Sequence, residues 1–304
     1  MPPCNVVAFD LGGTRLKAGI VEAGTGTVAA FTTAATAGLA AAPALKTLEE
    51  TGAALLDQHD AEAIGLAVPG IVDDGRIVAL PGKFEGIVGL DLAGELSDRL
   101  NRPVTVVNDA VAYGAGEAYF GAGAGCDRVV VMTIGTGVGV AVLERGRPVA
   151  HGPLGGGILG GQIPIADDRT GPTDTNGRRG TIEARCAAAS LTAYASAAGL
   201  AQATVEDVYA AAARKHDGAL AAVEEYRGWL ARGIVALAHA HTPEAVVLGG
   251  GPITPDAPVL DDLQAQVDEA LWPGYAVRVR SASLGDRASL IGLGHLALAQ
   301  GSAL

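Results

Sequence analysis

The chain has 304 residues, of which 49% are hydrophobic and 18% are charged, and its formal net charge is -12 with a sequence pI near 4.9. This length can supply two domains that each bury a core of their own, while the acidic balance excludes the basic surfaces that bind nucleic acids or anionic membranes. No apolar run reaches the ~18 residues of a membrane span and no secretory leader is recognisable, so we expect a cytoplasmic protein with small-molecule partners.

The first third of the chain alternates predicted strands with predicted helices. A glycine turn at Gly12 and Gly13 joins the first two strands, and Pro69 and Gly70 end the fourth. This alternation predicts an α/β fold. The expected strands lie at residues 6–9, 19–21, 27–32, 63–68 and 104–107, and the expected helices at 41–58, at 92–100 and around Glu117.

Residues 128–143 repeat the design of residues 9–21, because both stretches contain a strand, a glycine hairpin and a second strand. Alignment of the two stretches places Thr133 opposite Asp10. A duplication about 120 residues apart predicts two similar α/β halves that face one another across a cleft, each with one glycine hairpin. The two expected domains are a smaller one at 1–110 plus 286–304 and a larger one at 111–285.

The second half of the chain begins its helical part at Thr204, where Asp207 completes the pattern of a capping box. A longer helix follows and stops before Pro243. A buried strand at 245–248 delivers three glycines, and a strand at 276–280 and a helix at 288–299 close the chain. The core-facing stripe expected for the longer helix is Leu220, Val223, Leu230, Ile234 and Leu237.

Three glycine loops follow predicted strands. In the first, a strand ends in the carboxylate of Asp10 and turns through two glycines, which leaves backbone N–H groups and the Thr14 hydroxyl to face a phosphate. A structural hairpin is the alternative for each loop alone, but three together favour a nucleotide site. Neither the Walker A pattern nor a dinucleotide fingerprint fits their context. The other two loops are Gly135-Thr136-Gly137 and Gly249-Gly250-Gly251.

Asn108 and Asp109 stand at the carboxyl end of a predicted strand, where α/β sheets place ligands. A carboxylate at this position can orient an acceptor hydroxyl and take its proton during phosphoryl transfer. The alternative is that the pair caps the helix that follows, since Asn and Asp are preferred caps.

The ordered set of these motifs resembles the ROK (repressor, open reading frame, kinase) family of sugar kinases over essentially the whole chain. The resemblance implies a two-domain actin-like ATPase (ribonuclease H-like) fold with the active site in the cleft between the domains, and a homodimer. The motifs are Asp10-x-Gly-Gly-Thr14, Pro69-Gly70-x-Val72-Asp73, Asn108-Asp109-Ala110 with Glu117, Gly135-Thr136-Gly137-x-Gly139, Gly180-x-x-Glu183, Gly249-Gly250-Gly251 and Leu284-Gly-Asp-x-Ala288-x-x-x-Gly292.

The resemblance also implies roles for individual residues. Asp109 is then the general base of an ATP-dependent kinase that phosphorylates the exocyclic hydroxymethyl of a hexose or hexose-like polyol, and Asp10 binds Mg²⁺ through water or ATP. The implied sugar-binding positions are Gly70, Lys83, Asn108, Gln162 and Glu183. Those implied to bind ATP and its phosphates are Asp10, Gly12, Gly13, Thr14, Lys17, Thr133, Gly135, Thr136, Gly137, Gly249, Gly250 and Gly251.

The chain departs from the family where typical members bind a structural zinc through one His and three Cys. The corresponding positions hold Gln162, Asp174, Asn176 and Thr181, which cannot form the thiolate-rich site that zinc prefers. We therefore expect no zinc. The three cysteines, Cys4, Cys126 and Cys186, have spacings of neither a disulfide framework nor a zinc knuckle.

Sugar recognition is also expected to differ, because Leu159, Gln162 and Lys83 replace residues that contact sugar hydroxyls in the family. A kinase specific for a C7 cyclitol or an amino sugar is therefore one alternative to a glucokinase-like enzyme. A catalytically inactive sugar-binding regulator is another. Because the first strand is expected to begin at residue 6, we expect no DNA-binding region of the kind that some relatives carry. The retained Asn108, Asp109 and Glu183 argue against a chaperone-like or filament-forming ATPase.

Overall fold

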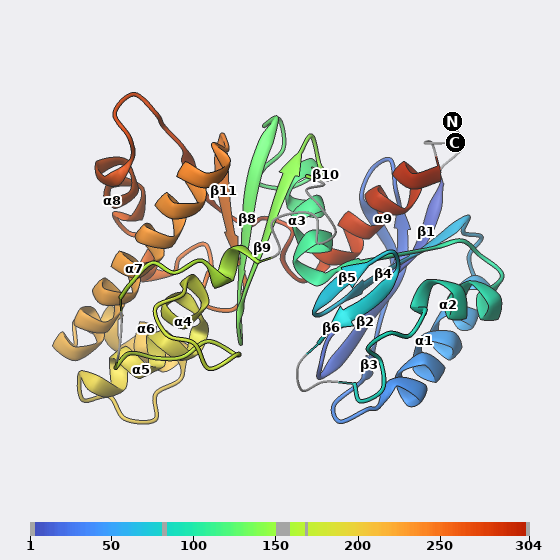
Figure 1. Cartoon of the computed structure of the whole chain (residues 1–304), viewed down its shortest axis with the longest axis horizontal. Coiled ribbons are helices and arrows are strands. Elements are labelled where there is room, and N and C mark those ends of the chain that lie inside the picture. The colour runs from blue at the N-terminus through green and yellow to red at the C-terminus, as the bar shows by residue number, and fades with distance from the viewer. Residues whose placement is uncertain (1–3, 81–83, 150–158, 168–169, 302–304) are drawn as a thin grey trace. The chain divides into compact units, whose positions relative to one another are not determined.

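The computed structural model describes residues 4–80, 84–149, 159–167 and 170–301 (Figure 1). The chain divides into two compact units. The first comprises Met1–Gly125, Leu143–Ile158 and Leu284–Leu304, and the second comprises Cys126–Val142 and Leu159–Ser283. The first division lies after Gly125 rather than near residue 110, because α3 (Asp109–Tyr119) packs along α9 (Ala288–Gly301) within the first unit.

The first unit is built on a five-stranded sheet in the order β3-β2-β1-β4-β7. The hairpins β1–β2 and β2–β3 are antiparallel, while β4 runs parallel to β1 and β7 parallel to β4. A separate two-stranded ribbon follows β4. The strands of the sheet are β1 (Asn5–Leu11), β2 (Arg15–Glu22), β3 (Thr27–Ala35), β4 (Ala63–Val68) and β7 (Val104–Asn108), and those of the ribbon are β5 (Ile71–Asp73) and β6 (Arg76–Ala79).

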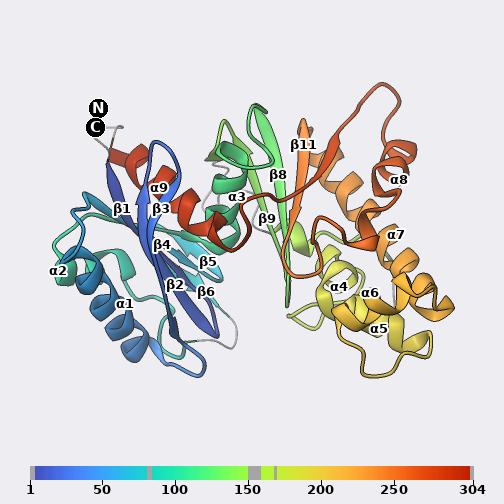
Figure 2. The ribbon, with the colours of Figure 1, turned by 180° about the vertical axis from the view of Figure 1, so that it is seen from behind.

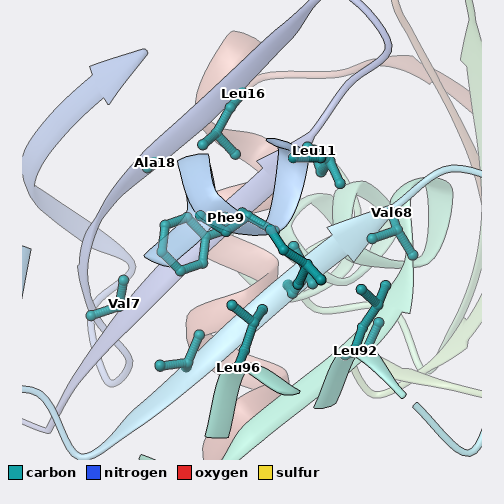
Figure 3. Packing of buried hydrophobic residues seen from close by; sticks show 14 of the residues in the cluster. Val7, Phe9, Leu11, Leu16, Ala18, Val68, Leu92 and Leu96 are labelled. Carbon is teal, nitrogen blue, oxygen red and sulfur yellow. The ribbon is translucent and has the colours of Figure 1, made fainter. Parts of the chain in front are cut away.

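Alternation along β1 assigns its side chains to two cores. Val7, Phe9 and Leu11 join the cluster that α1 (Ala41–Leu56) and α2 (Leu92–Leu100) cover (Figure 3), whereas Ala8 packs with residues of α3 and α9 on the opposite face. Figure 2 shows α9 against this second face. The helices thus cover both sides of the sheet and leave the carboxyl ends of β1, β4 and β7 at one edge.

The α3–α9 pair approaches closely because two glycines lie at its crossing. A Cβ on Gly116 would come within 2.2 Å of the Ala288 carbonyl oxygen, and a Cβ on Gly292 within 1.9 Å of the Ala112 carbonyl oxygen. Any side chain larger than hydrogen would therefore force the helices apart.

The second sheet has the order β10-β9-β8-β11-β12 and repeats the first. β8 and β9 form an antiparallel hairpin, and β8, β11 and β12 run parallel. β1 and β8 even share the same succession of buried and partly buried positions. The duplication predicted from sequence is therefore confirmed. The strands are β8 (Arg128–Ile134), β9 (Val138–Glu144), β10 (Arg147–Pro148), β11 (Ala245–Gly249) and β12 (Arg278–Ser281).

The helices of the second unit gather around the long α7, which buries Val223, Leu230, Ile234 and Leu237 as expected. Leu220 is 45% exposed, so its assignment to the core was wrong. Apolar periodicity predicts which face of a helix points inward, but not whether another element covers the first turn of that helix. The helices are α4 (Ile182–Cys186), α5 (Ala188–Ala197), α6 (Val205–Ala213), α7 (Asp217–His241) and α8 (Leu263–Ala270).

Shorter features complete the fold. The capping box predicted at Thr204 and Asp207 is present at the start of α6. Single 3-10 turns occur at Gly160–Gln162, Pro258–Leu260 and Gly285–Arg287. Within the described parts of the chain, no helix has the length and apolarity needed to cross a bilayer.

Candidate active site

Three neighbouring strands of the first sheet end beside the residues predicted to carry the chemistry. Asp10 of β1 pairs with Ala67 of β4, and Asn108 of β7 pairs with Val68 of β4. Gly70 follows β4 after one proline. Because parallel strands end at a common edge, the sheet brings these predicted residues together in the first unit.

The first glycine hairpin connects β1 to β2. The Gly12 N–H donates to the Arg15 carbonyl oxygen at 3.1 Å, and the Gly12 carbonyl accepts from the buried Thr36 hydroxyl at 2.6 Å. The Gly12 amide is thus engaged inside the hairpin, so the predicted phosphate contact depends on the amides of Gly13 and Thr14. Thr14 itself is exposed.

Asp10 lies in a mixed-charge cluster at the base of this hairpin. The Nζ atom of Lys17 is 4.0 Å from Oδ2 of Asp10 and 3.4 Å from Oδ1 of Asp286. Burial raises the pKa of Asp10, and the charge of Asp286 raises it further. Three neighbours lower the pKa of Asp10: Lys17, the Ser289 hydroxyl and Arg15. The Asp10 carboxylate is mostly buried but still accessible, and it has one cation, Lys17, beside it. Such an oxygen ligand suits a divalent metal ion that binds together with phosphate oxygens.

Asn108 caps α3, as the alternative interpretation of its dipeptide predicted. Its Oδ1 accepts from the N–H groups of Ala110 at 2.9 Å and Val111 at 3.3 Å, and its Nδ2 donates to the Gly70 carbonyl oxygen at 2.8 Å. Gly70 has φ +90°, and a Cβ there would lie 2.3 Å from a carbonyl oxygen of β6. The cap therefore joins the ends of β4 and β7.

Asp109 is the first residue of α3 and is exposed. Its Oδ1 accepts from the Ala110 N–H at 2.9 Å. Because the amino end of a helix favours negative charge, this position stabilises the carboxylate form that a general base needs. Both side chains accept from the Ala110 N–H, yet Asp109 stays exposed, so capping by Asn108 is compatible with display of the Asp109 carboxylate.

The second glycine hairpin lies in the second unit above a buried carboxylate. Oε2 of Glu183 accepts from the Val138 N–H at 3.0 Å, and Oε1 accepts from the N–H and hydroxyl of Thr175 at 2.8 and 2.6 Å. A Cβ on Gly137 would come within 2.6 Å of Glu183 Oε2. The described contacts of Glu183 are thus internal ones that position the hairpin, and its sugar contact stays a prediction.

The third loop adjoins the same hairpin. Thr133 of β8 pairs with Gly249 of β11, so the two strands end side by side. Gly250 has φ +102°, and a Cβ there would lie 2.0 Å from the Ile134 carbonyl oxygen. Only glycine fits this position, whereas Gly251 and the exposed Thr136 face open space.

The segment 174–181 is closed by Asp174, whose side chain is fully buried. Its Oδ1 accepts from the N–H groups of Asn176 at 2.9 Å and Arg178 at 2.8 Å, and its Oδ2 accepts from Arg178 Nε and the Thr181 hydroxyl, both at 3.2 Å. Gln162 accepts a further hydrogen bond from Arg178.

A cavity of about 500 Å³ opens in the first unit next to the first hairpin. Its wall includes Gly13 and Leu80, and Leu80 also packs over Gly70. The volume is within the range of small-molecule sites. Its other lining residues are Thr36, Gly38, Leu39, Ala40, Phe84, Glu85, Gly86 and Val88.

The sequence matches the model of the ROK family over residues 6–300. The chain belongs to the ROK family. A ROK hexokinase from Thermus thermophilus, 27% identical, superposes with a TM-score of 0.85 over 98% of this chain and 99% of its own. The predicted two-domain actin-like ATPase fold is therefore confirmed.

Two further ROK relatives are glucokinases. That of Thermotoga maritima is 27% identical over 290 residues, which cover 90% of each chain. A ROK glucokinase from Streptomyces griseus was solved with glucose and AMPPNP; it is 27% identical, with a TM-score of 0.78 over 97% of this chain and 99% of its own.

The segment 174–181 holds three of the altered zinc positions, Asp174, Asn176 and Thr181, and its described side-chain contacts centre on Asp174. One buried carboxylate takes four hydrogen bonds there. Of the other altered positions, Leu159 is 47% exposed and Lys83 lies outside the described residues. Among the residues that are described, no cluster of three or more His, Cys, Asp or Glu could hold a metal ion.

Sequence reasoning assigned no role to three residues that the structure connects to the ROK site. Asp286 contacts Lys17, Ser289 contacts Asp10, and the buried Glu117 accepts from the Leu284 N–H. Glu117 and Asp286 belong to the motifs that resemble the ROK family, and this membership was the only sign in the sequence that they have a role at the site. Their partners are far apart along the chain, so spacing alone could not reveal them.

Proposed function

We propose that this ROK protein is an ATP-dependent kinase that phosphorylates the exocyclic hydroxymethyl of a hexose, with Asp109 as general base. The observation that carries the proposal is the exposed Asp109 carboxylate at the start of α3, which follows β7 at the same edge of the sheet as the end of β1 that bears Asp10, with β4 between the two strands. The similarity to glucokinases over nine-tenths of both chains supports a hexose as acceptor.

In the proposed mechanism Asp109 accepts a hydrogen bond from the acceptor hydroxyl and takes its proton as the oxygen attacks the γ-phosphorus of ATP. The bond between that phosphorus and the β,γ-bridging oxygen breaks, and ADP leaves with the electron pair. The amide of Asn108 has two hydrogens, and one of them is used on Gly70. The other is available to a sugar hydroxyl. The rigid cap thus holds the base and a neighbouring donor in fixed relation, which is the main contribution that positioning makes to this chemistry.

The donor phosphates would be held by both glycine hairpins and by Lys17, and the adenosine would approach Gly249 to Gly251. Asp10 fits a Mg²⁺ site, because the ion commonly uses one carboxylate together with phosphate oxygens. Bound with ATP, Mg²⁺ supplies neutralisation of the phosphate charge. Lys17 adds a second positive charge at the same phosphates.

The cavity beside Gly13 offers room for part of an acceptor in the first unit, although Asn108 and Asp109 are not among the residues that line it. Its wall is shared with the hairpin through Gly13 and with the Gly70 turn through Leu80. Apolar side chains such as Phe84 can pack against the faces of a sugar ring, and the exposed Glu85 can accept from its hydroxyls.

The decisive test is ADP release with ATP, Mg²⁺ and a panel of hexoses, amino sugars and cyclitols. Turnover of a hexose is expected, and the variant Asp109→Asn should lose at least about 100-fold in kcat while it still binds sugar and AMPPNP. Asp217→Asn is a matched control, because Asp217 is also an exposed first residue of a helix; it should retain wild-type kcat.

Three results would contradict the proposal. Turnover by Asp109→Asn at the wild-type rate would show that Asp109 is not the general base. Sugar binding without any turnover would identify an inactive regulator. Preference for a cyclitol or amino sugar over every hexose would overturn the substrate class.

We further propose that the protein acts as a cytoplasmic homodimer. The support is its resemblance to ROK kinases and the acidic balance of the chain. Sedimentation velocity at micromolar concentration is expected to give twice the mass of the 30.3 kDa chain, and a single monomeric boundary would refute the dimer.

A further inference from the structure

A buried carboxylate on α3 fixes two segments that are remote from each other in sequence. Glu117 is fully buried; its Oε1 accepts from the Leu284 N–H at 2.8 Å and its Oε2 from the Ala122 N–H at 2.9 Å. A Cβ on Gly121 would approach Oε2 to 2.2 Å. Burial of a carboxylate is unfavourable unless hydrogen bonds compensate it, so Glu117 serves to position these backbone groups.

The turn that begins at Leu284 carries Asp286 toward the first glycine hairpin. The Nζ atom of Lys17 donates to the Asp286 carbonyl oxygen at 3.3 Å and to its Oδ1 at 3.4 Å. Burial first, and then the charges of Glu117 and Asp286, raise the pKa of Tyr113 of α3. Glu117, the turn and Lys17 therefore form one connected arrangement in the first unit.

Lys17 is directly opposite Asp10 in the β1–β2 ladder. This register favours a close ion pair between the two, since opposite residues of an antiparallel pair share a face. The Lys17 ammonium is nevertheless 4.0 Å from Asp10 and nearer to both acceptors of Asp286. Asp286 thus draws the ammonium away from its cross-strand partner.

We propose that Asp286 is a positioning residue that keeps Lys17 from neutralising Asp10, so that the Asp10 carboxylate is available to a divalent cation bound with a nucleotide. Glu117 fixes the turn from which Asp286 acts. This inference rests on the proposed function, because it concerns the nucleotide site of that reaction. Its electrostatic basis is simple: two carboxylates and one ammonium leave a net negative charge for the cation, whereas one carboxylate and one ammonium leave none.

The Asp286 side chain is 79% exposed, so its replacement is not expected to affect folding. Exposed ion pairs contribute little to stability. The effect of Asp286→Asn should instead appear in metal-dependent nucleotide binding, where loss of a residue that orients a ligand typically weakens affinity by about 10- to 100-fold.

The test is calorimetric titration of AMPPNP into wild type and Asp286→Asn, with saturating Mg²⁺ and in EDTA. Asp286→Asn should weaken Mg²⁺-AMPPNP binding by about tenfold or more without weakening binding in EDTA. Asp57→Asn, which removes an exposed carboxylate at the C-cap position of α1 in the same unit, should match wild type in both titrations.

A double-mutant cycle isolates the role of Lys17. In a Lys17→Met background no ammonium competes for Asp10, so only the direct charge effect of Asp286 remains and Asp286→Asn should weaken Mg²⁺-AMPPNP binding by a much smaller factor than in wild type. Glu117→Gln, checked for native circular dichroism, should weaken binding in the same metal-dependent way. If Asp286→Asn binds like wild type, or weakens binding equally in EDTA, the inference is wrong; if wild type binds no AMPPNP at all, the proposed function itself fails.

Discussion

His295 illustrates how one buried residue can make stability depend on pH. Its ring stacks on Tyr119 with centroids 4.0 Å apart and meets Phe120 edge-on. Its Nε2 atom is buried and has no hydrogen-bond partner within the described residues. Burial, with the nearby Arg147 charge, lowers the pKa of His295, so the folded state favours the neutral imidazole.

The sign of the pH effect follows from this depressed pKa. The unfolded chain binds a proton at His295 more readily than the folded protein, so the free energy of unfolding falls as pH drops through about 6.5. His295→Phe keeps the stacked ring but cannot titrate. Urea unfolding between pH 7.5 and pH 5 should show the variant losing less stability than wild type, by at most roughly 1.4 kcal/mol per pH unit; parallel curves would contradict this role.

The sequence could predict those candidate site residues whose role follows from the strand or helix next to them in the chain. Asn108 and Asp109 follow a buried strand and precede a helix, and both the cap and the display of a carboxylate follow from that context. Asp286 and Glu117 act through partners that only the folded chain brings near, Lys17 and Leu284. Their roles therefore required the structure.

At the level of elements, one buried carboxylate, that of Asp174, holds the segment 174–181 together through four hydrogen bonds. Asp174→Asn replaces one acceptor oxygen by an amide that faces two donors, Arg178 Nε and the Thr181 hydroxyl. We expect the free energy of unfolding to fall by about 2–4 kcal/mol, as for loss of a buried, charged hydrogen-bond centre. EDTA should leave the wild-type melting temperature unchanged.

Asp207→Asn is the control for this loop, because Asp207 is an exposed carboxylate that also accepts from a backbone N–H and a hydroxyl, both of Thr204. The loss of stability should be clearly smaller than that of Asp174→Asn, because Asp207 is exposed and water can replace its hydrogen bonds. Equal losses in the two variants would show that Asp174 has no special role. Stoichiometric zinc in the purified protein, with melting sensitive to EDTA, would contradict the expectation of no zinc.

Element prediction succeeded where periodicity and punctuation agreed. The β1–β2 hairpin, α2 and the α6 capping box all lie where apolar spacing meets a glycine turn or a cap. The short helices α5 and α8 were not predicted. α5 is rich in alanine and has no distinct apolar face, and α8 spans only eight residues, so neither supplies a periodic signal that stands out from its surroundings.

At the scale of the whole molecule, the duplicated sheets have each retained a glycine hairpin supported by a carboxylate. Asp10 lies under the first hairpin and Glu183 under the second. The duplication itself was visible in the sequence, because strand, hairpin and strand recur in order. The assignment of helices to each half was not visible in the sequence. The fit of α3 against α9 depends on Gly116 and Gly292, which are more than a hundred residues apart in the chain.

Two glycines allow the stability of the halves to be tested separately. Gly292→Ala places a Cβ 1.9 Å from the Ala112 carbonyl oxygen and should destabilise the first unit, whereas Gly228 in α7 faces open space. Gly228→Ala should stabilise the second unit by about 0.5–1 kcal/mol, because alanine is the better helix former. The same substitution, glycine to alanine, should thus lower the free energy of unfolding at one position and raise it at the other.

The position of the tryptophans provides the measurement. The chain has two, Trp229 and Trp272, and both lie in the second unit. Tryptophan fluorescence therefore reports on that unit, while far-ultraviolet circular dichroism reports on both. In Gly292→Ala the dichroism transition should begin at lower temperature than the fluorescence transition, and in Gly228→Ala the fluorescence transition should rise. Coincident, equally shifted transitions in Gly292→Ala would show that the two units, although each has its own core, unfold as one cooperative body.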